Sequence, residues 1–141
     1  MRTPDVNVLL YAEDAASVSH EVARKWLERS LSAAEPTGFT WLSLVGFLRI
    51  GTNPDIYPQP LSPREALDVM DGWLDHPHTV VLGPGDAHRR ILRRLIESTG
   101  TAGNLTTDAH LAAIAIAHGA TLASFDADFH RFKKLKLEYL G

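Results

Sequence analysis

Four aspartates stand where the predicted secondary-structure elements begin or end. Asp5 precedes the apolar run "VNVLLYA", and Asp108 follows a loop at the start of a predicted helix. Asp126 and Asp128 directly follow the apolar run 120–125. A charged group at the end of a buried strand must reach water or hold a positive partner. If folding gathers these ends, the carboxylates raise one another's pKa unless a cation lies among them, and an all-oxygen site of this kind selects Mg²⁺ or Mn²⁺.

Each aspartate also has a structural interpretation that the residues alone leave open. Asp108 could serve only as a partner of the helix dipole. Asp126 and Asp128 could be turn and cap residues of a short helix, "DFHRF", and Asp5 could be an isolated turn acid. One such residue is weak evidence for chemistry, whereas their shared position at element edges is stronger evidence.

Length and composition restrict the class of protein. The chain of 141 residues suits a single domain, residues 1–141, and its 45% hydrophobic content is that of a globular protein. It has no cysteine, which excludes disulfides and thiolate chemistry. The apolar run near the N-terminus is too short for a signal peptide or membrane span, so we expect a cytoplasmic protein. Because the net charge is −3, any attraction for phosphate must be local.

Helical and strand patterns alternate along the chain. Helices are predicted at 19–35, 43–50, 62–76, 85–99 and 106–119, and strands at 36–41, 78–82, 120–125 and 135–140. Ser62 and Glu65 form a predicted capping box, whereas a threonine cap and Gly119 are predicted to bound the last helix. This alternation favours an α/β domain on a mainly parallel sheet, whose ligands bind beyond the carboxyl ends of the strands. Asp126 falls at such an end.

Two stretches carry a resemblance to a known family. "PDVNVLLYA" and "GNLTTDAHLAAIAIAHGATLASFDADFHRF" are similar to motifs of the PIN-domain ribonucleases, specifically the VapC toxins of toxin–antitoxin pairs, and the match covers essentially the whole chain. The resemblance implies a three-layer α/β/α fold and metal-dependent cleavage of RNA. It also implies a small VapB-like antitoxin as inhibitor, and a homodimer. Asp5, Asp108 and Asp126 match the family's acidic positions, and Asp128 a further acid often found there.

The resemblance also bears on the start of the chain. "VNVLLY" could form a strand by composition, but in the family a short helix follows the first aspartate. "MRTP" is a poor strand sequence, so we expect either a stunted first strand or further residues upstream.

One position departs from the family pattern. The early buried helix "WLSLVGFLRIG" keeps Arg49 but has Gly46 where the family commonly carries a glutamate. We hypothesise that Asp128 or ordered water takes that place in a weaker or single-metal site. The alternative is a PIN domain with weakened catalysis that binds RNA or a partner.

Other polar residues are candidates for substrate contact. Asn7 and Asn104 could orient the ligands or hydrogen-bond a phosphate, although both suit turns equally well. The predicted helix at 85–99 carries an arginine face, and "RFKKLK" (131–136) is a second basic stretch. These side chains could clamp RNA phosphates or form an ordinary solvated face. The arginines of the face are Arg89, Arg90, Arg93 and Arg94.

Two further patterns suggest other chemistry. His76 and His78 in "HPHT" resemble a metal pair, but the proline between them favours a turn that enters a strand. A strand that ends in Asp-x-Asp is the nucleophile pattern of haloacid-dehalogenase-like phosphatases, which carry it near the N-terminus. Here it lies near the C-terminus. The sequence does not reveal the RNA target or the number of metals.

Overall fold

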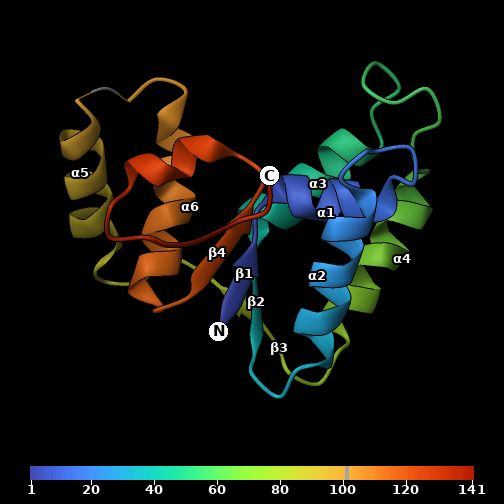
Figure 1. Cartoon of the computed structure of the whole chain (residues 1–141), viewed down its shortest axis with the longest axis horizontal. Helices are drawn as coiled ribbons and strands as arrows, with labels where there is room; N and C mark the ends of the chain where they lie inside the picture. The colour runs from blue at the N-terminus through green and yellow to red at the C-terminus, as the bar shows by residue number, and fades with distance from the viewer. Residues whose placement is uncertain (101) are drawn as a thin grey trace.

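A five-stranded sheet lies at the centre of the computed structural model, which describes residues 1–100 and 102–141 (Figure 1). The strand order is β3-β2-β1-β4-β5, and every neighbouring pair is parallel. The strands are β1 (Arg2–Pro4), β2 (Thr37–Thr40), β3 (Thr79–Leu82), β4 (Thr121–Ser124) and β5 (Lys136–Tyr139). Because β1 is central and pairs with β4, the chain positions just after these two strands lie side by side.

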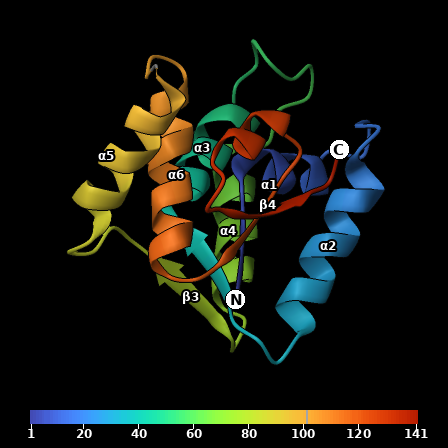
Figure 2. The same ribbon diagram turned by 60° about the vertical axis from the view of Figure 1, so that its left-hand side comes forward.

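Helices cover both faces of the sheet (Figures 1 and 2). One layer contains α1 (Val6–Glu13), α2 (His20–Ser32), α3 (Trp41–Gly51) and α4 (Pro63–Leu74). The other contains α5 (His88–Thr99) and α6 (Leu105–Ala117), which pack against each other. A short 3₁₀ helix, η1 (Ala127–Arg131), follows β4. The prediction of a three-layer α/β/α fold is confirmed, and the sheet is entirely parallel.

Each layer has its own hydrophobic core. On the α1–α4 side, Trp26, Phe39 and Phe47 are almost fully buried. On the α5–α6 side, Leu122 and Phe129 pack among the apolar residues of α6. Since both faces of the sheet are covered, its inner strands β1, β2 and β4 are largely buried, although they carry the polar residues Thr3, Thr37, Thr40 and Ser124.

Most of the predicted elements are confirmed with small shifts in their ends. "VNVLLY" is helical, within α1, and the first strand is indeed short, at three residues. The Ser62–Glu65 capping box is present, and Gly119 follows α6 with a φ of 63°. Thr79 follows a turn in which its amide bonds to the His76 carbonyl, as the "HPHT" pattern predicts.

Two predictions were wrong. The threonine cap fails because α6 begins earlier, with Asn104 at the N-cap position. The sequence also suggests exposed apolar surface around the proline-rich loop 51–63 and Trp73, and this is wrong for Trp73, which is 6% exposed and stacks on Phe39, whereas Ile56 of the loop is 53% exposed. The loop predicted at 100–104 includes Thr101, which lies outside the described residues.

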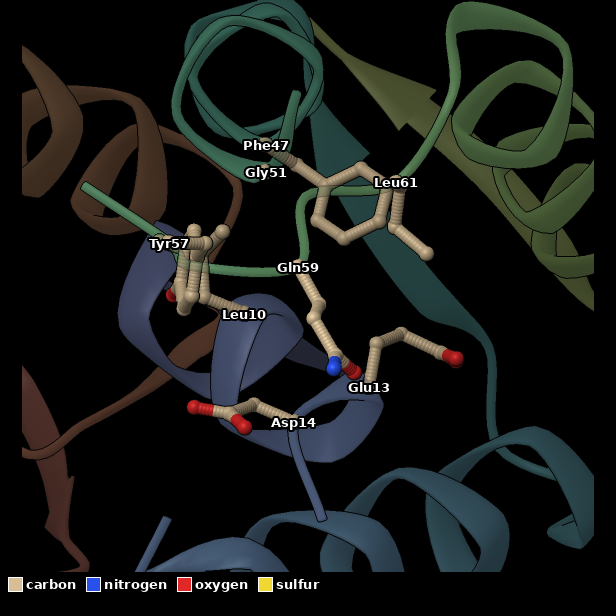
Figure 3. Close-up of a pocket in the computed structure, with 8 residues that line it drawn as sticks. All are labelled: Leu10, Glu13, Asp14, Phe47, Gly51, Tyr57, Gln59 and Leu61. Carbon is tan, nitrogen blue, oxygen red and sulfur yellow. The ribbon is translucent and has the colours of Figure 1, made fainter. Parts of the chain in front are cut away.

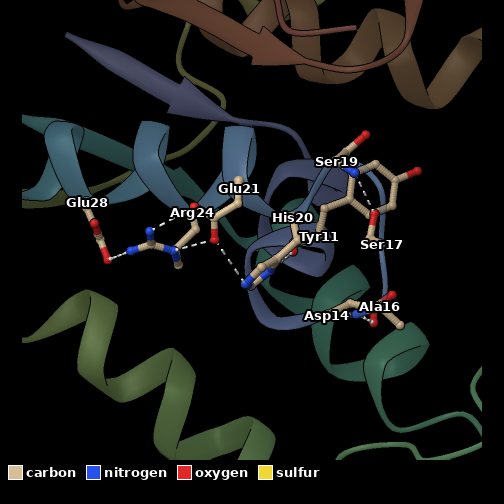
Figure 4. A network of polar contacts seen from close by, with 9 residues as sticks. All are labelled: Tyr11, Asp14, Ala16, Ser17, Ser19, His20, Glu21, Arg24 and Glu28. Atoms are coloured by element: carbon tan, nitrogen blue, oxygen red, sulfur yellow. Dashed lines mark hydrogen bonds and ion pairs between the residues drawn. The ribbon is translucent and has the colours of Figure 1, made fainter.

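The junction between α1 and α2 is held by polar contacts (Figure 4). The His20 ring nitrogen Nδ1 lies 2.8 Å from the Tyr11 carbonyl oxygen, and Asp14 accepts a hydrogen bond from the Ala16 amide. One turn into α2, Arg24 bridges two glutamates. The His20–Tyr11 contact ties the start of α2 to α1, the helix that Asp5 caps. No helix in the described part of the chain is long and apolar enough to cross a membrane.

Candidate active site

Asp5 lies at the junction between the central strand and the first helix. Its backbone amide continues the sheet by donating to the Ala123 carbonyl, at 2.9 Å. Its side chain caps α1 by accepting from the Val6 amide, at 2.7 Å. The residue is only 9% exposed, so its carboxylate is a buried acid at the carboxyl edge of the sheet.

Ser124, the last residue of β4, connects Asp5 to the second aspartate pair. Its hydroxyl donates to Oδ2 of Asp5 at 2.7 Å, and its oxygen accepts from the Asp126 amide at 2.9 Å and from the Asn7 side chain at 3.2 Å. The hydroxyl thus uses its one donor and both acceptor positions. Sequence reasoning missed this serine, although a polar residue at the end of a buried strand was a usable signal.

Asn7 completes the same network. Its amide nitrogen donates to Asp5 at 3.1 Å, and its carbonyl oxygen accepts from the Phe125 amide at 3.2 Å. Both ends of the side chain are therefore occupied, which fixes its orientation. This position agrees with the predicted role of orienting the first aspartate.

Asp126 and Asp128 flank the start of η1. The Asp126 side chain accepts from the Asp128 amide at 2.8 Å and so caps this short helix, as the structural interpretation of the sequence predicted. Asp126 is partly buried, whereas the Asp128 side chain is 54% exposed and lies 3.9 Å from Arg131. Asp126 does more than cap η1, because its charge also repels the carboxylates of Asp5 and Asp108.

Asp108, in the first turn of α6, is a partly buried acid with like charges near it. Burial, followed by repulsion from Asp5, Asp126 and Asp128 in that order, raises its pKa to about 6. Burial also raises the pKa of Asp5, against the hydrogen bonds from Ser124 and Val6. The structure thus brings three separate segments of the chain into one electrostatically coupled group of carboxylates.

A cavity of about 120 Å³ opens beside Asp5 and Asp108. Gly46 and Arg49 of α3 also line it, so the position where the family usually has a glutamate does face this space. A Cβ atom on Gly46 would lie 3.1 Å from Cγ2 of Val6, which leaves little room for a side chain unless Val6 moves. Within the described residues, Asp126 and Asp128 do not line the cavity.

The fit of this group to a metal ion is chemical rather than preformed. The donors are all carboxylate oxygens, which suit Mg²⁺ or Mn²⁺, and the repulsion felt by Asp108 is what a cation would relieve. However, no three acidic, histidine or cysteine side chains in the described chain stand together as a ready ligand set. The residues present thus fit a divalent cation in their charge and donor type, but they are not already arranged around one.

Asn104 and the four arginines of α5 make no hydrogen bond or ion pair with this group in the described chain. Asn104 is exposed, and its side chain forms no capping bond to α6. The four arginines of α5 are exposed, and Arg93 pairs with Glu97 at 2.8 Å. His110, two residues beyond Asp108 on α6, contacts His88, ring nitrogen to ring nitrogen at 2.9 Å.

Another acidic cavity lies on α1 and the loop after α3 (Figure 3). Figure 3 shows Glu13 and Asp14 around it, with Tyr57 and Gln59. These acids are one helix length from Asp5 and take no part in the coupled group at the edge of the sheet.

Comparisons with known proteins agree with this fold. The family model of the PIN domain matches residues 3–135. The chain therefore belongs to the PIN domain family.

Relatives of similar sequence indicate the group within that family. The chain is 40% identical to Ribonuclease VapC37 of Mycobacterium tuberculosis (96% of this chain and 94% of that protein) and 38% identical to Ribonuclease VapC33 of the same organism (96% and 95%). Its fold resembles the chains in VapBC2 from Rickettsia felis bound to a promoter DNA fragment (TM-score 0.67, 18% identity, 98% and 97% covered). It also resembles FitAcB from Neisseria gonorrhoeae (TM-score 0.66, 18% identity, 99% and 98% covered). The sequence relatives place the chain among the VapC proteins.

Proposed function

We propose that residues 1–141 form one PIN domain that hydrolyses RNA phosphodiester bonds internally, with a divalent cation, as a VapC-type toxin of the cytoplasm. The observation that carries this proposal is the convergence of Asp108 with Asp5 at one cavity, where burial, followed by repulsion from Asp5, Asp126 and Asp128, raises the pKa of Asp108 to about 6. The names of the relatives, which are ribonucleases at about 40% identity, support the substrate class.

Asp5, Asp108 and Asp126 are the proposed ligands and catalytic acids, and Asp128 is a further ligand. When bound, Mg²⁺ or Mn²⁺ supplies an activated water and neutralises charge at the cleaved phosphate. Asp5 contributes a carboxylate already fixed by Ser124 and Asn7. Asp108 contributes one that no hydrogen bond orients within the described chain, so its negative charge is free to act on a ligand. Asn104 is proposed to contact the RNA backbone from the start of α6.

A weakened PIN domain is the second candidate. Gly46 faces the cavity without a carboxylate, and the described acids are not arranged as a ready ligand set. Such a protein would bind RNA or a partner without cutting. The phosphatase alternative is set aside, because the chain belongs to the PIN domain family.

We also propose that a VapB-type antitoxin inhibits the protein and that it forms a homodimer. Exposed apolar side chains on α3 support an interface: Trp41 is 51% exposed and Val45 is 53% exposed. The solved structures of similar fold include VapBC complexes, which agrees with a partner of this kind.

The test is incubation of the antitoxin-free protein with total RNA and Mg²⁺ or Mn²⁺, followed by mapping of the cut ends. We expect internal cuts that require the cation and that disappear in Asp108→Asn. RNA binding without cation-dependent cuts would favour the weakened domain. Cuts that Asp108→Asn makes as efficiently as the parent would contradict the proposal.

A further inference from the structure

Four basic side chains meet at a cavity distinct from the acidic group. The cavity measures about 360 Å³ and lies between α5 and the segment that joins η1 to β5. Arg94 and Ser98 line it from α5, Arg131 from the end of η1, and Lys133 and Lys134 from the connecting segment. Leu95, which is 6% exposed, also lines it. One arginine of α5 and three basic residues of the stretch 131–136 therefore share one concave surface.

The positive charge at this cavity is largely uncompensated. In the described residues, Arg94, Lys133 and Lys134 have no carboxylate within ion-pair distance. Arg131 has only the long contact of 3.9 Å to Asp128. By contrast, Arg93 on the neighbouring side of α5 pairs with Glu97. In a chain with a net charge of −3, such a group is a local site for an anion.

The cavity is linked to the acidic group through η1. Asp126 caps the start of this helix and Arg131 is its last residue. At a rise of about 2.0 Å per residue, a 3₁₀ helix places the two roughly 10 Å apart along its axis. That span corresponds to about three stacked nucleotides at an axial rise of about 3.4 Å each.

We infer that this cavity binds the phosphate backbone of an RNA strand a few nucleotides from the bond that is cut. The inference rests on the proposed function and goes further by naming which cations hold the substrate. Of the four arginines on α5, only Arg94 takes part. Arg and Lys around a concave surface bind successive phosphates independently of the base sequence, so the cavity sets affinity and direction, not sequence preference.

The experiment measures binding of a mixed-sequence single-stranded RNA by fluorescence anisotropy at several salt concentrations. All proteins carry Asp108→Asn so that the RNA stays intact. One variant adds R94E, K133E and K134E. A matched variant adds K25E, R29E and R64E, which reverses the same charge at exposed positions on α2 and α4, across the sheet. A third variant, R94K with K133R and K134R, keeps the charge of the cavity.

We expect the cavity reversal to weaken RNA binding at least tenfold. The slope of log affinity against log salt should shrink by about 2, since each lost phosphate contact on a single strand removes about 0.7. The matched reversal should lose much less RNA affinity, and the charge-preserving variant should bind RNA like the Asp108→Asn reference. Equal midpoints of thermal unfolding would show that all the variants fold.

Three results would overturn the inference while the proposed function stands. The first is that the parent cleaves RNA while the cavity reversal binds RNA as tightly as the Asp108→Asn reference. The second is an equal loss of RNA affinity from both reversals. Capture of poly-glutamate by the cavity with no change in RNA binding would assign it to an acidic protein partner and also overturn it. If the parent neither binds nor cleaves RNA, the proposed function itself fails.

Discussion

The two sides of the acidic group differ in how the structure holds them. Asp5 is fixed by three donors, from Val6, Asn7 and Ser124. Asp108 is partly buried and has three like charges near it, and these two causes raise its pKa to about 6. One side is therefore ordered before any ligand arrives, whereas the other carries unbalanced charge. The β1–β4 edge of the fold therefore orients one carboxylate, whereas α6 brings in the unbalanced negative charge that would attract the proposed cation.

Removing the charge of Asp108 should have the largest effect. Asp108→Asn keeps the shape of the side chain but removes a proposed ligand, so we expect cleavage of RNA to fall by at least about 100-fold. The fold should persist, because no hydrogen bond within the described residues is lost. Circular dichroism and cleavage rates measure the two effects. A loss of activity together with unfolding would mean that Asp108 is structural.

Disrupting the hydrogen bonds around Asp5 should reduce RNA cleavage less than Asp108→Asn does, but it should lower the stability of the fold more. Ser124→Ala leaves the Asp126 amide and the Asn7 amide group without their acceptor, which should lower stability by about 1–3 kcal/mol and cation affinity by about 10–100-fold. Ser30→Ala is the matched control, because the Ser30 hydroxyl is buried with no partner in the described chain. Denaturant unfolding and Mn²⁺ titration compare the variants. Equal losses of stability and of Mn²⁺ affinity in Ser124→Ala and Ser30→Ala would show that the hydrogen bonds of Ser124 do not order Asp5.

The raised pKa of Asp108 predicts that the stability of the fold depends on pH. With its pKa raised to about 6, native Asp108 keeps a proton that the unfolded chain, near 3.8, has released. The native state therefore binds more protons in this window, and this group lowers the free energy of unfolding as pH rises from about 4 to about 6. The raised pKa of Asp5 acts in the same direction. In EDTA, Asp108→Asn should become more stable than the parent above pH 6, by denaturant unfolding, and Mn²⁺ should reduce that gap. A gap that does not change with pH would contradict the coupling.

Restoring a carboxylate at Gly46 should have the smallest effect. Gly46→Glu adds a charge that faces the cavity, but its Cβ must displace Val6. We expect Mn²⁺ affinity to rise only a few-fold, and the double variant with Val6→Ala to do better because the crowding is relieved. Gly46→Gln is the control of equal size. If neither glutamate variant binds Mn²⁺ better than the parent, Gly46 does not mark a missing ligand.

Much of this architecture could be predicted from local patterns. Alternating helices and strands gave the parallel sheet, and aspartates at element edges gave the acidic group. The start of α6 could not be placed, because Thr106, Thr107 and Asn104 are all acceptable caps. Trp73 was misplaced because its burial depends on Phe39 and Phe47, which are distant in sequence. Ser124 went unnoticed since its partners, Asp5 and Asn7, are more than a hundred residues away. Long-range packing and hydrogen bonds were thus the information that the local sequence lacked.

The most direct test of the convergent carboxylates is calorimetric titration of Mn²⁺ into the parent and into Asp108→Asn at a pH above 7. We expect Mn²⁺ to bind the parent saturably and to bind Asp108→Asn at least tenfold more weakly. Binding to the parent should release protons, and fewer protons should be released as the pH rises further above 6. No saturable binding to the parent, or equal binding to both proteins, would contradict the proposed site.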